Sequence, residues 1–317
     1  MPKKLRIASF FAGVGGIDLG FHNAKKFETV YANEFDTYPR DVFEANFNVK
    51  VDLRDIHDVE PDDIPDVDVI IGGFPCTSFS LAGYRKGFED ERTGDLFFEL
   101  ARLIKAKKPK IIFLENVKNL VGHDNGKTFQ IILDCLDNIG YHVKHLVMNA
   151  AQYGNIPHGR ERIYIVGFLD IEQYYHFDMP KPIPLTTKLE DVIDFDVKQD
   201  DKYYYTDKCK FYNKLKEDMT KQHTIYQWRR VYVRENKSNV CPTLTANMGT
   251  GGHNVPLILT PYGIRKLTPR ETFNLQGFPK DYVLPDNISD GRLYKCAGNS
   301  VVVPVIQRIA ENITKVL

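Results

Sequence analysis

The dipeptide Pro75-Cys76 is the part of this sequence best placed to do covalent chemistry. The apolar run before it, residues 67–74, predicts a strand that delivers the cysteine to a loop at the carboxyl edge of a sheet. Open α/β proteins bind their ligands at that edge. A thiol that stands beside a rigid proline and next to a glycine-containing loop is placed to react rather than to pack in a core.

A carboxylate and two arginines stand at the ends of later predicted strands. Glu115 comes directly after four apolar residues, where burial would raise its pKa and let it donate a proton near neutrality. Arg160 and Arg162 open another strand, and residues two apart lie on one face, so we expect both guanidinia to project together. Such a pair could bind a carbonyl or a phosphate. Alternatively, the two arginines have no ligand and simply lie at an exposed strand end.

A glycine-rich turn, Phe11 to Gly16, follows the first predicted strand and opens a helix. Its glycines let the backbone approach a nucleotide-like ligand closely, as in both dehydrogenases and methyltransferases. The pattern is not GxGxxG, and Phe11 suits stacking on a sulfonium or a purine. Glu34, at the end of the second strand, could accept hydrogen bonds from ribose hydroxyls, and Asp55 could hold an adenine amino group.

A mostly parallel sheet with helices on both faces would bring these residues together, because strand and helix patterns alternate through the first half. Strands are predicted at residues 5–11, 29–33, 67–74, 110–115, 142–148 and 163–168, and helices at 17–24, 38–46, 96–107 and 127–139. Three prolines in residues 179–185 predict a linker. We therefore expect a catalytic and cofactor-binding domain at 1–178, a smaller domain at 186–285, and a C-terminal segment at 286–317 that packs back on the first domain through a helix at 303–316.

The composition is that of a soluble globular protein, with 43% hydrophobic and 26% charged residues among 317. The five cysteines form no CxxC pair and no cluster with histidine, which fits a reducing cytoplasm and predicts no metal site. The basic, apolar N-terminus imitates a secretory signal, but it runs into glycines and lacks a cleavage site. No apolar run approaches the ~20 residues that span a bilayer, so we expect no membrane contact.

Net charge is zero, but the charges are segregated. Residues 202–237 hold ten Lys or Arg against four acids, with tyrosines and one tryptophan interleaved. This segment could lie along a phosphate backbone, or it could be a solvated helix face.

Six blocks in this order resemble the DNA (cytosine-5)-methyltransferases, the small bacterial restriction–modification members in particular. They are Phe11-Ala-Gly-Val-Gly-Gly16, Gly73-Phe-Pro-Cys-Thr-Ser-Phe-Ser80, Glu115-Asn-Val117, Arg160-Glu-Arg162, Arg265-Lys-Leu-Thr-Pro-Arg-Glu271 and Gly298-Asn-Ser-Val301. The match covers essentially the whole chain. One departure is His158, where the family usually has glutamine. The resemblance implies an α/β fold: a Rossmann-like, S-adenosylmethionine-dependent methyltransferase sheet with a smaller, irregular target-recognition domain.

The resemblance also implies a mechanism and a cofactor pocket. Cys76 would attack carbon 6 of a cytosine, Glu115 would bind or protonate ring nitrogen 3, Arg162 would hold the exocyclic oxygen, and Arg160 would buttress the Cys76 loop. Carbon 5 would take its methyl group from S-adenosylmethionine, which leaves S-adenosylhomocysteine. The residues assigned to the cofactor pocket are Phe11, Gly13, Gly15, Gly16, Glu34, Phe35, Asp55, Gly73, Pro75, Leu96, Asn299 and Ser300.

The DNA is expected to present its cytosine flipped out of the duplex, with residues 77–95 as the loop that closes over it. Expected DNA contacts are Ser80, Arg85, Lys86, Arg92, Arg229, Arg230, Thr243, Gly249, Gly251 and Gly252. The recognition segment resembles that of enzymes for GC-rich sites of four or five base pairs, GCNGC among them. We expect a cytoplasmic monomer of a bacterium or phage that acts on double-stranded DNA, with a cognate restriction endonuclease as a functional, not physical, partner.

Three other interpretations are weighed against this one. A transfer-RNA cytosine methyltransferase of the same architecture would carry Cys-Phe-Thr, which this chain lacks, and a shorter recognition segment. An inactive binding module has no need of Cys76, Glu115 and Arg162 together. An oxidoreductase has no role for the Pro-Cys loop or the Gly-Asn-Ser-Val block.

Overall fold

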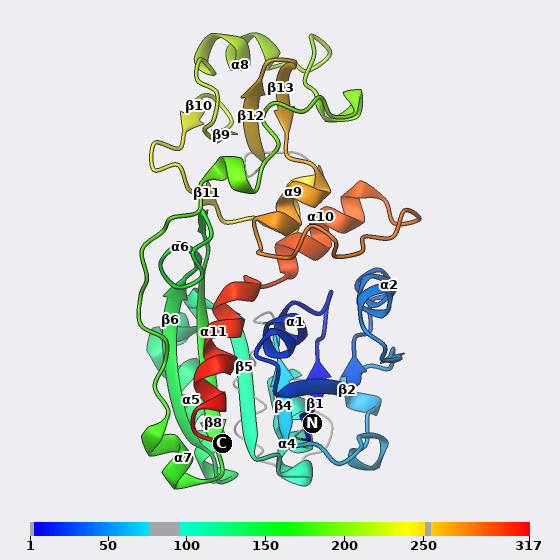
Figure 1. Ribbon diagram of the computed structural model, residues 1–317, viewed down its shortest axis with the longest axis vertical. Coiled ribbons are helices and arrows are strands. Elements are labelled where there is room, and N and C mark those ends of the chain that lie inside the picture. Colours follow the sequence, from blue (N-terminus) through cyan, green and yellow to red (C-terminus); the bar gives the residue numbers. More distant parts are fainter. Residues whose placement is uncertain (1–2, 76–95, 251–254) are drawn as a thin grey trace. The chain divides into compact units, whose positions relative to one another are not determined.

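The computed structural model describes residues 3–75, 96–250 and 255–317 (Figure 1). The chain divides into two compact units. Unit 1 comprises residues 1–148, 161–181 and 305–317, and unit 2 comprises residues 149–160 and 182–304. The functional division into 1–178, 186–285 and 286–317 stays a prediction.

Within the described residues, unit 1 is built on a seven-stranded sheet in the order β3-β2-β1-β4-β5-β8-β6. Its strands are β1 (Leu5–Phe10), β2 (Phe27–Asn33), β3 (Val51–Asp52), β4 (Val69–Gly72), β5 (Ile111–Val117), β6 (His142–Asn149) and β8 (Glu161–Phe168). β1 pairs in parallel with β2 and β4, β2 with β3, and β4 with β5. β8 differs, because it pairs antiparallel with β5. The central strands are buried on both faces, as their unbroken apolar runs require.

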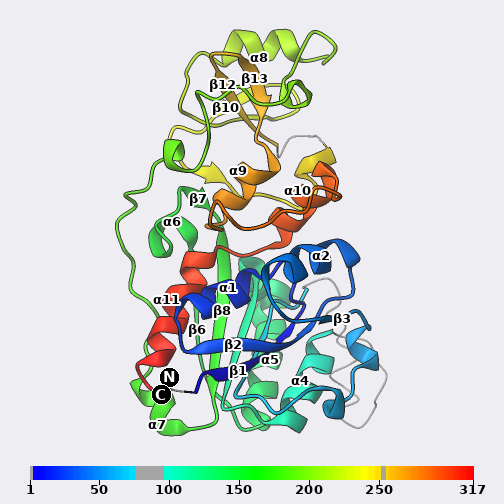
Figure 2. The same cartoon turned by 45° about the vertical axis from the view of Figure 1, so that its right-hand side comes forward.

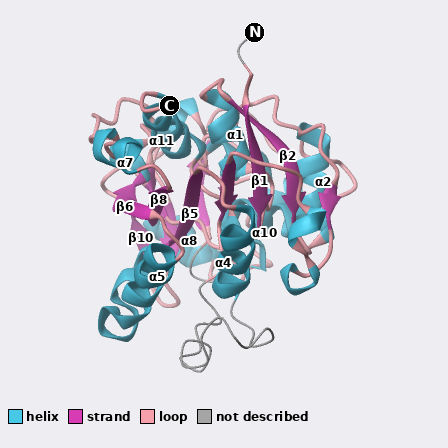
Figure 3. Cartoon of the chain, turned by 90° about the horizontal axis from the view of Figure 1, so that it is seen from below, coloured by secondary structure: helices cyan, strands magenta, loops and turns pink. Residues whose placement is uncertain are grey.

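Helices cover both faces of this sheet. They are α1 (Gly16–Asn23), α2 (Thr37–Asn46), α4 (Leu96–Lys107), α5 (Lys127–Asn138), α7 (Ile171–His176) and α11 (Val303–Thr314). Figure 3 shows α1 and α11 on one face and α4 and α5 on the other. α1 and α11 pack closely, since a Cβ on Gly20 would lie 2.5 Å from Ile306 Cβ. The end of the chain is thereby fixed against its beginning.

Unit 2 has a sheet of its own, in the order β10-β9-β12-β13, and Figure 2 labels three of these strands, β10, β12 and β13. These strands are β9 (Tyr226–Trp228), β10 (Val233–Glu235), β12 (Pro256–Thr260) and β13 (Gly263–Lys266), and a separate two-stranded pair joins β7 (His158–Gly159) to β11 (Cys241–Pro242). The helices are α6 (Ala150–Tyr153), α8 (Tyr212–Asp218), α9 (Pro269–Asn274) and α10 (Asp290–Asn299). Leu215 of α8 and Met219, just after this helix, pack with Tyr226, Leu257 and Ile264 to form the local core.

A buried ion pair explains the Arg265–Glu271 block. Arg265 and Glu271 are 0% and 1% exposed, and both guanidinium Nη atoms donate to the carboxylate at 2.7 Å. The same carboxylate accepts from the Thr268 amide at 2.7 Å, which completes a capping box at the start of α9. The block therefore holds β13 and α9 together within unit 2.

Candidate active site

Four of the proposed site residues gather at the carboxyl edge of the unit 1 sheet. Phe11 follows β1, Glu34 follows β2, and Gly73 follows β4. Glu115 lies one position beyond Leu114, the residue of β5 that pairs with the last residue of β4. Parallel strands bring equivalent ends to one edge, so the topology itself assembles this group.

The glycine turn after β1 is fixed by its neighbour strand. The Gly13 amide donates to the Glu34 carboxylate at 3.0 Å. Gly13 and Gly15 have φ angles of 54° and 77°, in the left-handed region that favours glycine. A Cβ on Gly15 would lie 2.3 Å from the Phe47 ring, so no side chain fits there. Gly16 then begins α1.

The groups beside this turn fit a nucleoside. The Glu34 carboxylate accepts from the backbone amides of Gly13 and Asp36, which fix it at the strand end. Phe35 is 71% exposed, an unusual surface position for a large flat ring. Phe11, at φ 51°, turns the backbone at the strand end. Asp55 caps a 3₁₀ turn, and hydrogen bonds from the backbone and ring nitrogens of His57 hold the pKa of its carboxyl below the usual value.

Glu115 and Arg162 form a largely buried ion pair across two strands. The Arg162 Nε atom lies 3.1 Å from a Glu115 carboxylate oxygen, and the two side chains are 14% and 10% exposed. In the antiparallel register, Glu115 is opposite Tyr164 and Arg162 is opposite Val117. Glu115 and Arg162 are therefore diagonal neighbours on one face of the sheet. The pair presents a carboxylate and a guanidinium side by side at the edge where the predicted nucleophile loop begins.

The segment that leads to the nucleophile is anchored by Asn116. Its side-chain amide donates to the Phe74 carbonyl at 2.8 Å, in a buried position. A Cβ on Gly73 would lie 3.4 Å from a Glu115 carboxylate oxygen, so a larger residue there would crowd that oxygen. Pro75 is half-buried at the end of the described segment.

The predicted nucleophile and the predicted DNA-closing loop lie outside the described residues. They comprise Cys76 and, from the loop, Ser80, Arg85, Lys86 and Arg92. Leu96, assigned to the cofactor pocket, is half-buried where α4 begins.

Arg160 and Arg162 make separate contacts, although the sequence pattern predicts both on one strand. β8 begins at Glu161, and Arg160 belongs to unit 2. The buried Arg160 guanidinium donates to the carbonyls of Leu244 and Gly298, each at 3.1 Å, and to that of Ser300. The expectation that Arg160 buttresses the Cys76 loop concerns residues outside the described chain. Of the two unit 2 residues assigned to the cofactor, Asn299 is exposed and Ser300 half-buried.

The predicted DNA contacts of unit 2 fall into two groups. Arg229 and Arg230 lie in the turn between β9 and β10, and Arg230 is exposed with φ 70°. Thr243 has an internal partner instead, since its hydroxyl donates to the Gly159 carbonyl at 2.6 Å. Gly249 packs closely on α10, where a Cβ would lie 2.9 Å from the Tyr294 ring. Gly251 and Gly252 lie outside the described residues.

Sequence reasoning gave no role to three residues that the structure places at key contacts. They are Asn116, His158 and Gly298. Asn116 and Gly298 stand inside the blocks that carry the resemblance, which was the available signal. Their partners lie far away in sequence and only the fold reveals them.

A buried polar network lies beneath the glycine turn. The Asp18 carboxylate accepts from the Ser9 hydroxyl at 2.9 Å and the Thr29 hydroxyl at 2.7 Å. Burial raises the pKa of Asp18 to about 6. The Thr29 amide donates to the His22 ring at 2.9 Å, and burial, with a smaller effect of Lys4, lowers the pKa of His22 to about 4. The acid and the base of this network therefore both favour their neutral forms.

Among the described residues, no helix is long and apolar enough to span a bilayer. In the same part of the chain, no three His, Cys, Asp or Glu side chains are grouped so that they could hold a metal ion.

Comparisons with known proteins agree with this geometry. The family described as C-5 cytosine-specific DNA methylase matches residues 5–315. The chain is similar to the Type II methyltransferase M.Bsp6I of Bacillus sp. (strain RFL6), with 64% identity over 98% of this chain and 99% of that protein. It is 37% identical to the Type II methyltransferase M.HhaI of Haemophilus parahaemolyticus, over 98% of this chain and 94% of the relative.

The fold has solved counterparts. The crystal structure of the S. pombe Dnmt2 methyltransferase matches with a TM-score of 0.75 at 18% identity, covering 98% of this chain and 99% of that one. At 18% identity, this structural similarity shows only that the two chains share a fold, an α/β methyltransferase sheet. The sequence match across the chain shows the family. This chain belongs to the C-5 cytosine-specific DNA methylases and is a DNA (cytosine-5)-methyltransferase.

Proposed function

We propose that this methyltransferase acts on a flipped-out cytosine through Cys76, Glu115 and Arg162, with S-adenosylmethionine bound along the carboxyl edge of the unit 1 sheet. The observation that carries the proposal is the buried ion pair between Glu115 and Arg162. Its carboxylate and guanidinium match the two polar groups on one edge of a cytosine, ring nitrogen 3 and the exocyclic oxygen.

In the proposed reaction, the Cys76 thiolate forms a bond to carbon 6, and the electron pair of the 5,6 double bond moves toward carbon 5 and into the ring. Negative charge then develops at ring nitrogen 3 and the exocyclic oxygen. Glu115, in its protonated form, donates a hydrogen bond or a proton to the nitrogen, and Arg162 stabilises the oxygen. Burial strengthens both interactions, because little water competes.

When bound, S-adenosylmethionine supplies an electrophilic methyl group for carbon 5. Carbon 5 then loses its proton to water, the carbon–sulfur bond at carbon 6 breaks, the cysteine returns as a thiolate, and Glu115 recovers its proton from the nitrogen. Glu34 would orient the ribose, the exposed ring of Phe35 would stack on the adenine, and Asp55 would hold the adenine amino group. Gly13 and Gly73 leave room at the backbone.

Residues 186–285 are proposed to read the DNA sequence, with the Arg229–Arg230 turn and the Thr243–Gly252 segment facing the major groove. The proposed site is GC-rich and of four or five base pairs, with GCNGC as the first candidate. The proposed setting is the bacterial cytoplasm, where a monomer protects host DNA from a cognate restriction endonuclease. Exchange of residues 186–285 with those of a relative should move the specificity, and an unchanged site would overturn this assignment.

Bisulfite sequencing of plasmid DNA from cells that express the protein tests activity and site together. We expect one short sequence to be protected at every occurrence. Transfer RNA from the same cells is the control substrate and should stay unmodified. Duplex DNA with 5-fluorocytosine at the target should trap a covalent adduct, and Cys76→Ser should abolish the adduct while DNA binding persists. Full methylation by Cys76→Ser would end the proposed mechanism.

A further inference from the structure

We infer that Asp18 is the positioning residue of the glycine turn at residues 11–16. Its buried carboxylate ties β1, α1 and β2 together, so that the turn and Glu34 are in place before the cofactor binds. This role rests on the proposed function, in which S-adenosylmethionine lies against the turn. A residue with no exposed surface would thereby set the affinity for the cofactor.

The Asp18 carboxylate closes the glycine turn at its base. Ser9 is the last residue but one of β1, and Asp18 is the third residue of α1, so the turn lies between them in sequence. The Ser9 hydroxyl donates to Asp18 Oδ2 at 2.9 Å, and both residues are buried. The strand that enters the turn is therefore bonded directly to the helix that leaves it.

The second oxygen of the same carboxylate holds β2. Thr29 donates its hydroxyl to Asp18 Oδ1 at 2.7 Å. The pairing of β2 with β1 shifts by one residue directly after Thr29, so β2 carries a bulge there. A bulge interrupts the hydrogen-bond ladder and bends the strand. The bond to Asp18 thus fixes β2 at a point where regular pairing does not.

His22 holds the same threonine through its backbone. The Thr29 amide donates to His22 Nε2 at 2.9 Å. His22 lies four residues after Asp18 in α1, so the two side chains lie on one face of the helix. The helix that begins at the glycine turn therefore binds Thr29 by both its hydroxyl and its amide.

The strand that Thr29 anchors ends at the proposed cofactor site. Glu34 follows β2, and its carboxylate accepts from the Gly13 amide at 3.0 Å. The Ala12 amide donates to the Asn33 carbonyl at 3.1 Å. The turn and the end of β2 are thereby bonded to each other at two points, and Asp18 fixes both of the strands that carry them.

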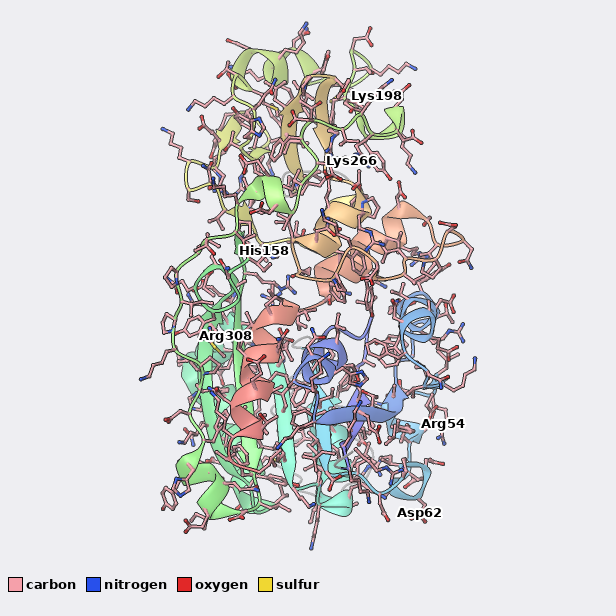
Figure 4. The ribbon with its side chains drawn as sticks, in the orientation of Figure 1. Arg54, Asp62, His158, Lys198, Lys266 and Arg308 are labelled. Atoms are coloured by element: carbon pink, nitrogen blue, oxygen red, sulfur yellow. The ribbon has the colours of Figure 1, made fainter. Side chains whose placement is uncertain are left out.

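The other side of β2 has a more exposed support. The Asn33 side-chain amide donates to the carbonyls of Asp52 and Arg54 at 3.1 and 2.9 Å. Arg54, labelled in Figure 4, is exposed, and its guanidinium pairs with Asp52 and Asp63 at 2.6 and 2.9 Å. Exposed ion pairs contribute little, because water and salt compete with them. We expect the buried bonds of Asp18 to be the stronger support.

A turn that is fixed before its ligand binds lowers the entropic cost of binding. Loss of a bond to Asp18 should therefore weaken the binding of S-adenosylhomocysteine and raise KM for S-adenosylmethionine. In contrast, kcat at saturating cofactor and DNA should change little, because Asp18 touches none of the reacting atoms. A residue that contributed only to stability would leave the affinity of the folded protein unchanged.

The experiment measures the Kd of S-adenosylhomocysteine by calorimetry in two pairs of variants. Thr29→Val removes the hydroxyl and keeps the shape of the side chain, and we expect Kd to rise by about three- to tenfold. Thr29→Ser keeps the hydroxyl and should stay within about twofold of the wild type. Asp18→Ala should raise Kd more than Thr29→Val does. Asp18→Asn should largely restore the affinity, because its amide can accept from one hydroxyl and donate to the other.

Tyr141→Phe is the matched control. It also removes one buried hydroxyl, which donates to the Pro109 carbonyl at 2.6 Å, away from the turn. Its Kd should equal that of the wild type. Hydrogen exchange of the unliganded protein gives a second readout: the amides of residues 11–16 should exchange faster in Thr29→Val and at the wild-type rate in Tyr141→Phe.

Should Asp18→Ala fail to fold, the two Thr29 variants decide. If Thr29→Val binds S-adenosylhomocysteine as tightly as Thr29→Ser, or loses kcat while its Kd is unchanged, this inference alone is overturned. A wild type that neither binds S-adenosylhomocysteine nor methylates DNA would overturn the proposed function as well.

Discussion

Asp18 gives a quantitative test of the buried network beneath the glycine turn. Burial raises the pKa of its carboxyl from 3.8 to about 6, so the folded protein prefers the protonated form. Its contribution to stability is fully present below pH 3.8 and is lost as the pH rises through 6. At about 1.4 kcal/mol per pKa unit, ionisation of Asp18 costs the folded protein about 3 kcal/mol at neutral pH.

His22 acts in the opposite sense over the same range. Its pKa falls from 6.5 to about 4, so its contribution is present above pH 6.5 and is lost as the pH falls toward 4. The magnitude is again about 3 kcal/mol. In the wild type the two contributions offset each other, so their sum should change little between pH 4 and 6.5. Asp18→Asn removes one of them.

An asparagine amide in place of the Asp18 carboxylate can accept from one hydroxyl and donate to the other, because the Ser9 and Thr29 hydroxyls can rotate. We therefore expect Asp18→Asn to be more stable than the wild type at pH 7, by up to about 3 kcal/mol, and to lose that advantage toward pH 4. Urea unfolding at several pH values between 4 and 7.5 measures the effect. Asp62→Asn, at an exposed carboxyl, is the control. A variant that is less stable than the wild type at pH 7 would refute the reasoning.

Three further substitutions test other contacts. Arg162→Met should leave the buried Glu115 carboxylate without its guanidinium partner. We expect the rate constant of methylation, measured in a single turnover, to fall by about 10²-fold or more, and Arg162→Lys to be intermediate. Gly298→Ala should destabilise unit 2 by about 1–3 kcal/mol in urea unfolding, because its methyl would meet backbone, whereas Gly291→Ala in the same helix, where a Cβ meets nothing within 4 Å, should not. Glu271→Gln should lower the free energy of unfolding by about 3–5 kcal/mol by the same measurement, because it leaves the buried Arg265 guanidinium without its carboxylate.

The parallel part of the sheet could be predicted from sequence because its signals are local. Apolar runs such as Ile111–Leu114 are long enough to identify a strand, and alternation with amphipathic helices implies parallel pairing. The end of that strand was misjudged: β5 continues through Glu115 to Val117. Polar residues at a strand end look like a loop in sequence, although here they are paired with β8.

Unit 2 was harder to predict because its elements are short and its contacts distant. β9, β10 and β11 have three, three and two residues, too few for an alternating pattern to stand out. The partners of Arg160 lie 84 to 140 residues away along the chain. Spacing along one strand suggested that Arg160 and Arg162 act together. The Arg160 guanidinium is instead buried among the carbonyls of distant segments, and sequence spacing does not reveal which segments the fold brings around it.

The antiparallel strand β8 is what makes the Glu115–Arg162 pair possible. In a parallel sheet only the carboxyl ends of strands meet at the ligand edge, so a residue near the start of a strand would lie at the opposite edge. Arg162 is the second residue of β8, and Glu115 is near the end of β5. These two positions can become neighbours only if the strands run in opposite directions. A slip of one residue would move the guanidinium to the other face of the sheet, so the register of β8 on β5 fixes the pair as firmly as the residue types do.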